Sequence, residues 1–332
     1  MLQYIARRIV LMIPTLFLVS VISFILIQLP PGDYLTSLVA AMSTTGDVMT
    51  QDRLDAYRLE YGLDQPVYVQ YTKWMWNILS RGNFGFSFQW NRPVTELISD
   101  RLATTVLLTF FTMVFTWTIA LPIGIYSATH QYSKLDYLFT SVSFIGLATP
   151  DFLLALVLIW LGIAYLNRNL AGLFSPEFVD APWSLARLMD MIKHMWIAVV
   201  ILGTSGTAGL IRIMRGNLLD ELNKPYVITA RAKGLTENRL LWKYPVRVAI
   251  NPFVSTIGWS LAGLFSGSTI VAVVLGLPTV GPLLLGALLA QDMYLAGSIL
   301  LIISALTVIG TLISDILLAW VDPRIRFEGG SR

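Results

Sequence analysis

Side chains that could do chemistry are few in this sequence, and they are widely spaced. The 332-residue chain has no cysteine and two histidines, His130 and His194, which lie far apart in the sequence. Covalent catalysis needs a nucleophile beside a base, and a metal site needs several ligands at short spacing. We therefore expect no catalytic residue, no metal site and no bound cofactor. An intramembrane enzyme is the less favoured alternative.

Two acidic residues stand inside long apolar runs, where an ionisable side chain is costly in lipid and is a functional candidate. Asp151 follows Pro150, so we expect a kinked helix there. The Asp151 carboxylate would either contact a passing solute or bond to a neighbouring helix. For Asp315 we expect a structural ion pair with Arg212 or Arg215. A proton-coupled transporter working alone would need more ionisable residues near the midplane than Asp151 provides.

A third feature is a strongly basic segment between two apolar runs. From Arg212 to Arg247 the chain carries eight Lys and Arg residues against three acids. Pro225 suits the first turn of a helix, Gly234 can end that helix in a left-handed conformation, and Pro245 limits a second helix that starts after Thr236. The pattern predicts a compact helix–turn–helix plug that a partner could grip. A solvated basic loop that only fixes the topology is the alternative.

These residues must be positioned by membrane helices. The composition is 55% hydrophobic and 13% charged, whereas soluble domains carry roughly 25% charged residues. Long continuous apolar runs favour helices that span a bilayer over a β-barrel. We predict an all-α integral membrane protein with six transmembrane helices, at residues 9–29, 102–128, 137–166, 194–214, 252–275 and 297–320.

Charge placement predicts the topology. Basic residues precede the first span and also lie in the loop at Lys134, in the 212–247 segment and in the C-terminal tail. Positively charged segments of membrane proteins stay in the cytoplasm. Both termini are therefore expected to be cytoplasmic. We divide the chain into residues 1–29 (tail and span one), 30–101 (a periplasmic region between spans one and two) and 102–332 (five spans, with a cytoplasmic segment at 215–250). Aromatic residues of the second part should lie against the bilayer: Trp74, Trp76, Phe84, Phe86 and Trp90.

The fifth predicted span is rich in small residues, which let membrane helices pack closely and could also leave room for a solute. Together with Asp151, we take three of its residues as candidates for a translocation path: Ser260, Ser266 and Ser268. The stretch 278–290 that follows is too short to cross and predicts a re-entrant or interfacial turn.

Several motifs resemble those of ABC-transporter permeases of the dipeptide/oligopeptide group of binding-protein-dependent importers. They are "YIARRIVLMIPTLFLVSVISFILIQLPPGD", "YGLDQPVYVQYTKWMWNILSRGNFGFSF", "RPVTELISDRLATTVLLT", "RIMRGNLLDELNKPYVITARAKGL" and "DPRIRF". Their order and spacing fit that group from Tyr4 to Phe327. The resemblance implies the type I ABC importer permease fold in a bacterial inner membrane, and "ARAKGL" resembles the EAA loop, the coupling helix of the family. Thr229 stands where many relatives of other subfamilies carry Glu.

The resemblance also implies partners: a second homologous permease in a heterodimer, two ATP-binding subunits, a periplasmic solute-binding protein and the lipid bilayer, but no nucleic acid. ATP and magnesium would be bound by the ATPase subunits, since this chain has no G-x-x-x-x-G-K-[ST] loop. Peptides are the solute that the resemblance implies, and oligosaccharides are the alternative. The residues expected to couple to the ATPase are Tyr226, Thr229, Ala230, Arg231, Ala232, Lys233, Gly234 and Leu235.

Overall fold

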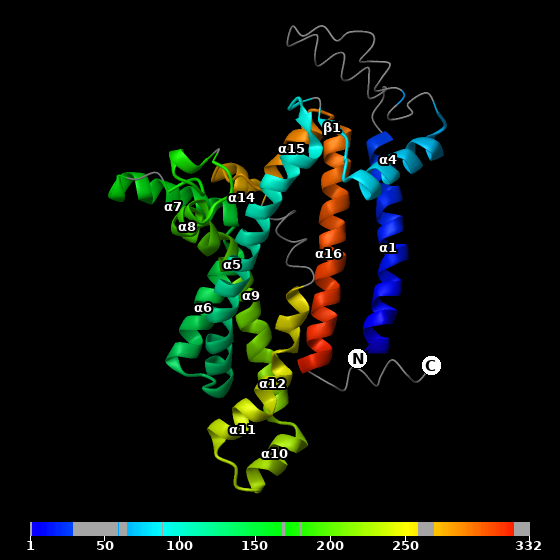
Figure 1. The fold of residues 1–332 in the computed structure, drawn as a ribbon. Coiled ribbons are helices and arrows are strands. Elements are labelled where there is room, and N and C mark those ends of the chain that lie inside the picture. The colour runs from blue at the N-terminus through cyan, green and yellow to red at the C-terminus, as the bar shows by residue number, and fades with distance from the viewer. Residues whose placement is uncertain are drawn as a thin grey trace. The chain divides into compact units, whose positions relative to one another are not determined.

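The computed structural model describes residues 2–28, 59, 65–87, 89–167, 170–179, 181–257 and 269–321. The described chain is almost entirely helical (Figure 1). Its contacts divide it into two compact units. One comprises Met1–Arg8, Val106–Pro278 and Ile309–Arg332, and the other comprises Ile9–Thr105 and Thr279–Val308. The first contains the basic segment, and we call it the coupling unit; we call the other the hairpin unit.

The hairpin unit holds most of α1 (Leu2–Gln28), α4 (Val67–Arg81), a short antiparallel hairpin of β1 (Phe86–Ser87) and β2 (Arg92–Pro93), α15 (Val280–Leu289) and the beginnings of α5 (Val94–Thr129) and α16 (Met293–Val321). Phe24, Trp74 and Tyr294 form its buried aromatic cluster. The Asp292 carboxylate is fully buried, and it accepts hydrogen bonds from the Ser87 hydroxyl (2.5 Å) and the Leu295 N–H (3.3 Å). These bonds fix the β1–β2 hairpin to the start of α16.

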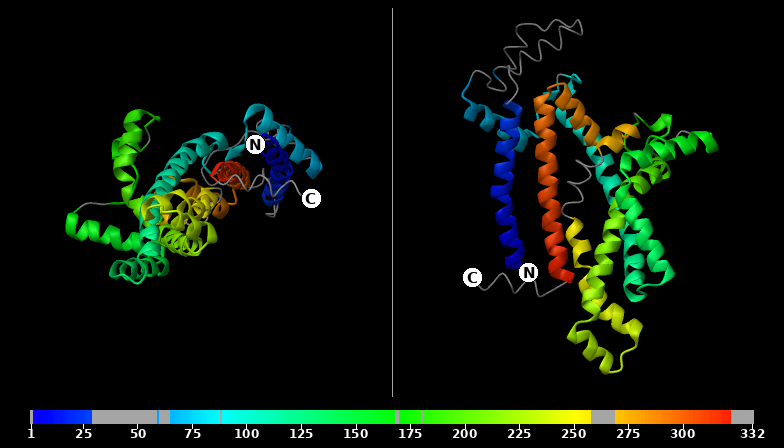
Figure 2. Two further views of the ribbon diagram at one scale, coloured as in Figure 1. Left: turned by 90° about the horizontal axis from the view of Figure 1, so that it is seen from below. Right: turned by 180° about the vertical axis from the view of Figure 1, so that it is seen from behind.

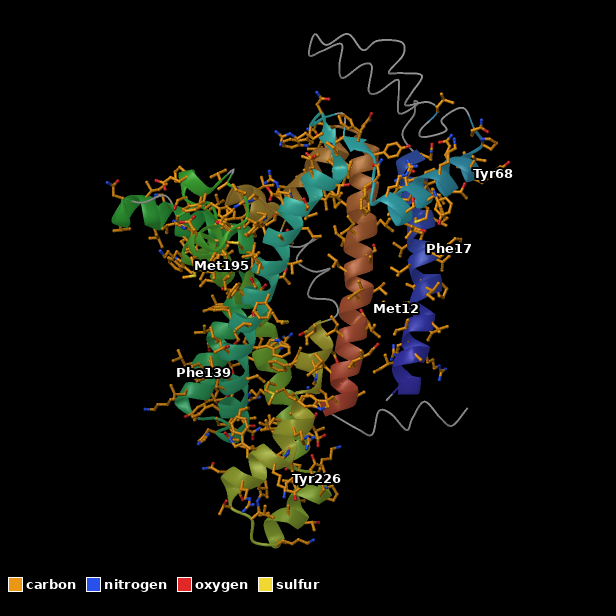
Figure 3. The ribbon with its side chains drawn as sticks, viewed as in Figure 1. Met12, Phe17, Tyr68, Phe139, Met195 and Tyr226 are labelled. Carbon is orange, nitrogen blue, oxygen red and sulfur yellow. The ribbon has the colours of Figure 1, made fainter. Side chains whose placement is uncertain are left out.

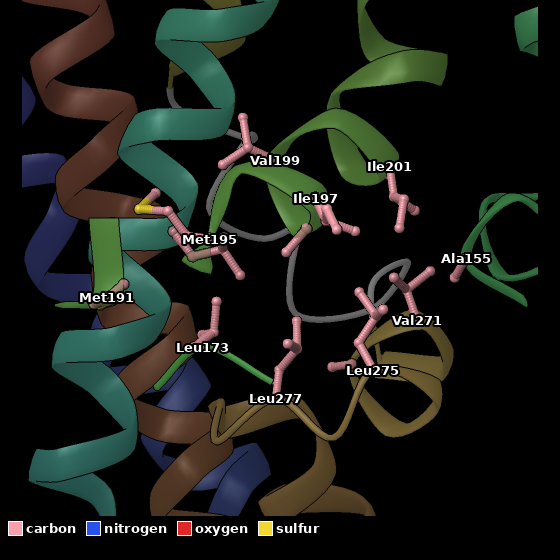
Figure 4. Packing of buried hydrophobic residues seen from close by; sticks show 13 residues of the cluster. Ala155, Leu173, Met191, Met195, Ile197, Val199, Ile201, Val271, Leu275 and Leu277 are labelled. Atoms are coloured by element: carbon pink, nitrogen blue, oxygen red, sulfur yellow. The ribbon is translucent and has the colours of Figure 1, made fainter. Parts of the chain in front are cut away.

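The coupling unit contains most of α5, α6 (Lys134–Ala148), α7 (Asp151–Leu166), the 3-10 turn η1 (Pro176–Phe178), α8 (Leu185–His194), α9 (Trp196–Leu222), α10 (Pro225–Ala232), α11 (Glu237–Lys243), α12 (Pro245–Ala249), α14 (Thr269–Val274) and the end of α16. Two apolar cores lie along α9. The first joins its N-terminal part to α5, α7, α8 and α14, with Leu173, Met191, Ile201 and Leu275 fully buried (Figure 4). The second joins the C-terminal part of α9 to α5 and α12.

The segment between α7 and α9 is folded around two charged side chains. Arg187 is buried, donates hydrogen bonds to the carbonyls of Ala181 and Val179, and stacks on the rings of Phe174 and Trp183. Asp190 accepts hydrogen bonds from the backbone N–H and the hydroxyl of Ser175. Burial raises the pKa of Asp190, but these bonds outweigh it and hold the pKa below its usual range.

Among the described residues, four helices are long and apolar enough to cross a membrane: Ile5–Leu26, Val94–Thr129, Trp196–Leu222 and Tyr294–Val321. They correspond to the predicted spans one, two, four and six. The predicted fifth span, 252–275, lies in part outside the described residues. The short apolar helix α15 agrees with the expectation that residues 278–290 do not cross.

The predicted third span is not one straight helix, because α6 and α7 meet at a bend of 99°. Pro150 lacks an N–H and disfavours helical backbone at the residue before it. Thr149 accordingly has an extended conformation (ψ 120°), and α7 restarts at Asp151. The sequence predicted a kink here, and the bend is large enough for the pair to be either a broken span or a re-entrant loop.

Helix α5 begins at Val94 and continues without a break past residue 101, so the end of the predicted 30–101 region belongs to the same helix as the predicted second span. The helix starts early because Val94 and Ile98 are buried and extend its apolar pattern beyond the membrane-length run.

One close contact between α5 and α9 depends on Gly124. A Cβ atom at this position would lie 2.6 Å from Cβ of Met214 and 3.1 Å from the carbonyl oxygen of Ile211. The second of these neighbours is backbone and cannot rotate away. The two helices can therefore pack at this distance only with glycine at position 124.

We predict that Gly124→Ala destabilises the protein, because overpacking of this kind costs about 1–3 kcal/mol. Gly209→Ala is the matched control, since nothing lies within 4 Å of a Cβ built there on α9. Thermal unfolding of the purified membrane protein in detergent measures both variants. Equal unfolding temperatures for the two variants would show that the close approach is not required.

Candidate coupling site

The basic segment forms a helical hairpin that continues from the end of α9. Figures 1 and 3 show α10 and α11 beyond this end, and the reverse view in Figure 2 shows the same arrangement. Helix α9 ends at Leu222, Asn223 caps it, and Pro225 occupies the first turn of α10. The missing N–H of proline costs nothing there, because the first N–H groups of a helix have no intrahelical partner.

Gly234 ends α10 as predicted, in the left-handed conformation (φ +80°). The Gly234 N–H bonds to the Arg231 carbonyl (3.0 Å), and the Leu235 N–H bonds to the Ala230 carbonyl (3.4 Å). This pair of bonds is a Schellman motif, which satisfies carbonyls that the helix end would leave unpaired. It turns the chain sharply toward α11.

The hairpin has a small apolar core of its own. Val227, Ala230 and Leu240 are buried against one another, and Leu235 and Tyr244 cover them. This corrects one expectation: Ala230 holds α10 against α11 and does not offer its surface to a partner. Pro245 follows Tyr244 and starts α12, so the second short helix ends where the sequence predicted.

The remaining predicted coupling residues lie mostly on the outside of the hairpin. Ala232, Lys233, Gly234 and Thr229 are exposed, and Tyr226 is just exposed. The sequence analysis missed two exposed apolar side chains, Ile228 on α10 and Trp242 on α11. Large apolar residues in a segment otherwise rich in charge were the available signal. At about 100° per residue, Ile228 and Ala232 share one face of α10.

Arg231 makes its ion pair within the hairpin. Its guanidinium donates two hydrogen bonds to the Glu237 carboxylate, at 2.6 and 3.1 Å, and so links the end of α10 to the start of α11. This hydrogen bonding, with the positive charge, lowers the pKa of Glu237. Both side chains are solvent-exposed, so the pair serves mainly to orient the two helices.

Helix α12 joins the hairpin to the membrane part of the coupling unit. Val246 and Ala249 of α12, and Phe253 after it, pack against Met214 and Leu218 of α9. The Phe253 ring also meets Trp117 of α5 edge-on, with ring centroids 5.9 Å apart. The hairpin is therefore held at both of its ends by one apolar core.

A buried ion pair fixes the loop between α5 and α6 to α9. The Arg215 guanidinium donates two hydrogen bonds to the Asp136 carboxylate, both at 3.0 Å, and this carboxylate also accepts the Tyr132 N–H. Asp136 is 3% exposed. Ser133 caps α6 by accepting the Asp136 N–H. The loop and the last turns of α9 are thus bound together just before the hairpin.

The predicted partner of Asp315 was wrong. We expected an ion pair with Arg212 or Arg215, but the Asp315 carboxylate pairs with Arg8 (2.8 Å). Arg215 is already engaged by Asp136, and Arg212 is exposed. Arg215 and Asp315 each form an ion pair, but with Asp136 and Arg8 and not with each other.

Candidates for the translocation path are only partly described. Asp151 is the first residue of α7, at the bend, and its carboxylate accepts a long hydrogen bond from the Ser205 hydroxyl of α9 (3.4 Å). It is only partly buried. The three serines predicted for the path, Ser260, Ser266 and Ser268, lie outside the described residues.

Comparison with known proteins covers the whole chain. Residues 120–327 match the family "binding-protein-dependent transport system inner membrane component", and residues 1–109 match its N-terminal region. The oligopeptide transport system permease protein AppB of Bacillus subtilis is 37% identical over 98% of this chain and 100% of its own length. OppB of Haemophilus influenzae, an oligopeptide transport system permease, is 32% identical over 98% of this chain and 100% of its own length.

A third relative has a different solute in its name. The peptidoglycan transport system permease protein YejB of Agrobacterium fabrum is 30% identical, over 98% of both chains. The family match covers more than half of the chain, and the membrane-length helices described above agree with it. This chain therefore belongs to the family of binding-protein-dependent transport system inner membrane components, and it is a multi-pass integral membrane protein.

Proposed function

We propose that this chain is a permease subunit of an ATP-driven importer of oligopeptides, and that the α10–α11 hairpin receives the force of ATP hydrolysis from a separate ATPase subunit. The observation that carries the proposal is the hairpin itself, which is prefolded by its own core and its Schellman turn and presents an exposed small-residue face. The names of the relatives support peptides as the solute. Oligosaccharides are the second candidate, because YejB is named for the transport of peptidoglycan, a polymer that contains sugars.

The docking surface is best assigned to the face of α10 that carries Ile228 and Ala232. A small side chain permits close approach of a partner, and an exposed isoleucine contributes apolar area when it is covered. Gly234 lies at the tip, and a Cβ atom added there would have no neighbour within 4 Å, so this end of the hairpin is free to enter a cleft. The sequence has no phosphate-binding loop, so the ATP and magnesium belong to the partner.

Movement of the hairpin would reach the membrane through α9. The apolar core at Met214 and Phe253 holds both ends of the hairpin, and the Arg215–Asp136 pair adds the loop between α5 and α6 to the same body. A displacement at α10 would therefore move α9, α12 and the inner ends of α5 and α6 together. Coupling of this kind requires contacts that differ between inward-facing and outward-facing states.

The rest of the machinery follows the family. A second homologous permease would complete the path, two ATPase subunits would lie on the cytoplasmic side, and a solute-binding protein would deliver the peptide from the periplasm. We place both termini in the cytoplasm of a bacterial inner membrane, with six spans in total. Asp151 and Ser260, Ser266 and Ser268 remain candidates for the path, and a stand-alone secondary transporter or an intramembrane enzyme remains a minor alternative.

We predict that Ala232→Glu uncouples the transporter. A carboxylate buried without a partner costs several kcal/mol, and each 1.4 kcal/mol lowers binding about tenfold. Co-purification of the ATPase subunits and peptide-stimulated ATP hydrolysis should both fall at least about tenfold. Asn238→Glu on α11 adds the same charge at another exposed position of the hairpin and should leave both unchanged. Normal ATPase recovery with Ala232→Glu would contradict the assignment of this face.

A second prediction concerns the left-handed turn. Gly234→Val places a β-branched residue at φ +80°, which costs about 1–2 kcal/mol of local stability although no atom is in its way. Gly234→Asn is the control, because asparagine tolerates this conformation. Gly234→Val should speed hydrogen exchange of residues 225–244 and lower peptide uptake into vesicles. Gly234→Asn should change either quantity very little. Equal effects of the two substitutions would mean that the backbone conformation is not what matters.

The third prediction tests transmission through the buried ion pair. Removing one partner of a buried pair is destabilising by about 3–5 kcal/mol, and less where one side chain is partly exposed, as Arg215 is. Asp136→Asn and Arg215→Gln should each raise the number of ATP molecules hydrolysed per peptide transported. The double variant should cost less than the sum of the two, with a coupling energy of about 0.5–3 kcal/mol. If the effects of the two single substitutions simply add in the double variant, both in the free energy of unfolding and in the ATP-to-peptide ratio, then Asp136 and Arg215 do not act together.

A further inference from the structure

Helix α4 carries more exposed apolar surface than its place outside the predicted spans explains. Three large side chains of this helix are mostly exposed: Tyr68 (71%), Trp76 (68%) and Leu79 (76%). The helix belongs to the hairpin unit, as does α1 from Ile9 onward, so the contacts between these two helices can be followed residue by residue. They give the direction in which each face of α4 points.

The residues of α4 that contact α1 follow one another around the surface of α4 in the same order in which their partners follow one another along α1. Gln70 accepts a hydrogen bond from Gln28 at the end of α1 (2.8 Å), and Trp74 packs on Phe24 (ring centroids 5.5 Å apart). Tyr71 reaches further down, to the Ser20 hydroxyl (2.7 Å) and the Phe17 ring (6.4 Å). Phe17 lies eleven positions before Gln28 on α1, or about 16 Å along the helix at 1.5 Å per residue.

The side chains of α4 therefore divide into three sectors. At about 100° per residue, Gln70, Trp74 and Tyr71 span about 100° of the helix surface, in the order in which they descend α1 toward its N-terminus. The sector next to Tyr71 continues that descent. It carries Met75, which packs in part on the aromatic cluster, and then Tyr68, Leu79, Thr72 and, at its far edge, Trp76. The sector next to Gln70 faces the opposite way, and it carries Asn77, Lys73 and Ser80.

The descending direction is the direction into the bilayer. Residues Ile5–Leu26 of α1 form a membrane-length apolar helix whose outward side chains, such as Ile13, Phe17 and Ile22, are exposed. Figure 1 shows α4 crossing α1 near its Gln28 end, and Figure 3 shows Phe17 further down the same helix. The exposed sector of α4 is thus continuous with the exposed apolar surface of a membrane-length helix.

We propose that α4 is an interfacial helix whose Tyr68–Met75–Trp76–Leu79 sector lies in the lipid of the leaflet at the Gln28 end of α1. Tyrosine and tryptophan are the side chains preferred at this depth, because their rings are apolar and their polar atoms reach water or headgroups. The polar sector around Asn77 faces the aqueous side. In the expected topology this is the periplasmic leaflet, and α4 fixes the height and rotation of α1 in the bilayer.

The proposal also revises the predicted set of bilayer-facing aromatics. Trp74 was expected to face lipid, but it is buried against Phe24. Trp76 faces outward, as expected, and Tyr68, which the sequence analysis did not select, joins it. A partner protein rather than lipid on this sector is the competing possibility, and the experiment below distinguishes the two.

Nitroxide labels on single cysteines test the assignment in the assembled transporter in lipid nanodiscs, since the chain has no native cysteine. Leu79→Cys and Ser80→Cys form a matched pair of neighbouring exposed positions, and the exposed Tyr68→Cys with the half-buried Asn77→Cys forms a second pair from the two sectors. Ile22→Cys on α1 is the reference for lipid. The unmutated assembly, taken through the same labelling, controls for cysteines in partner subunits, and peptide uptake confirms that each variant is assembled.

We expect labels at positions 79 and 68 to collide several-fold more often with dissolved oxygen than with a water-soluble nickel chelate, as at position 22. Labels at 80 and 77 should show the reverse. A label at position 79 that is as accessible to the nickel chelate as the label at 80 would place this sector in water and overturn the proposal. Low accessibility to both reagents would also overturn it, because a protein would then cover the sector.

Discussion

The packing of α9 along its whole length is the interaction on which the coupling unit depends. Its N-terminal part is buried in one apolar core with α7, α8 and α14, and its C-terminal part in another with α5 and α12. Lipid offers no hydrophobic drive for helices to associate, so close contact and small residues must hold them. Gly124 provides such a contact on α5. Gly203 provides another in the N-terminal part of α9, where a Cβ atom would meet the Phe115 ring. In the coupling that we propose, an element packed in this way would move as a rod and carry a displacement of the α10–α11 hairpin to the helices packed on it.

Buried charge is used in the coupling unit to tie loops and helix ends to this rod. The Asp136 carboxylate is satisfied by Arg215, by the Tyr132 N–H and by the Thr140 hydroxyl. A desolvated pair adds little net stability compared with an apolar pair, but it strongly disfavours any arrangement that separates the two charges. The apolar cores therefore supply the free energy of packing, and the ion pair specifies which loop lies against which turn of α9.

The features that were predictable from the sequence are those fixed by local chemistry. Pro225 and Pro245 restrict the backbone at their own positions, and Gly234 permits the left-handed turn (φ +80°), so the two short helices and the turn between them could be placed within a residue or two. The break at Pro150 was predictable for the same reason, but its 99° angle was not, because the direction of α7 is set by its packing in the core with α9 and α14. Ion-pair partners were also missed. Whether Asp315 meets Arg8 or Arg215 depends on the register of helices far apart in the sequence, and one chain without an alignment carries no signal for that register.

The internal pairing of Arg231 changes how docking on the hairpin should be understood. A basic segment on a permease suggests attraction to acidic side chains of a partner, yet one edge of this guanidinium, formed by Nε and Nη2, already donates to Glu237. Because both side chains are exposed, the pair contributes little stability, and its main effect is to orient the start of α11 against the end of α10. In the docking that we propose, shape and apolar contact at Ile228 and Ala232 would provide most of the specificity of the interface, with the remaining positive charge speeding association more than it strengthens binding.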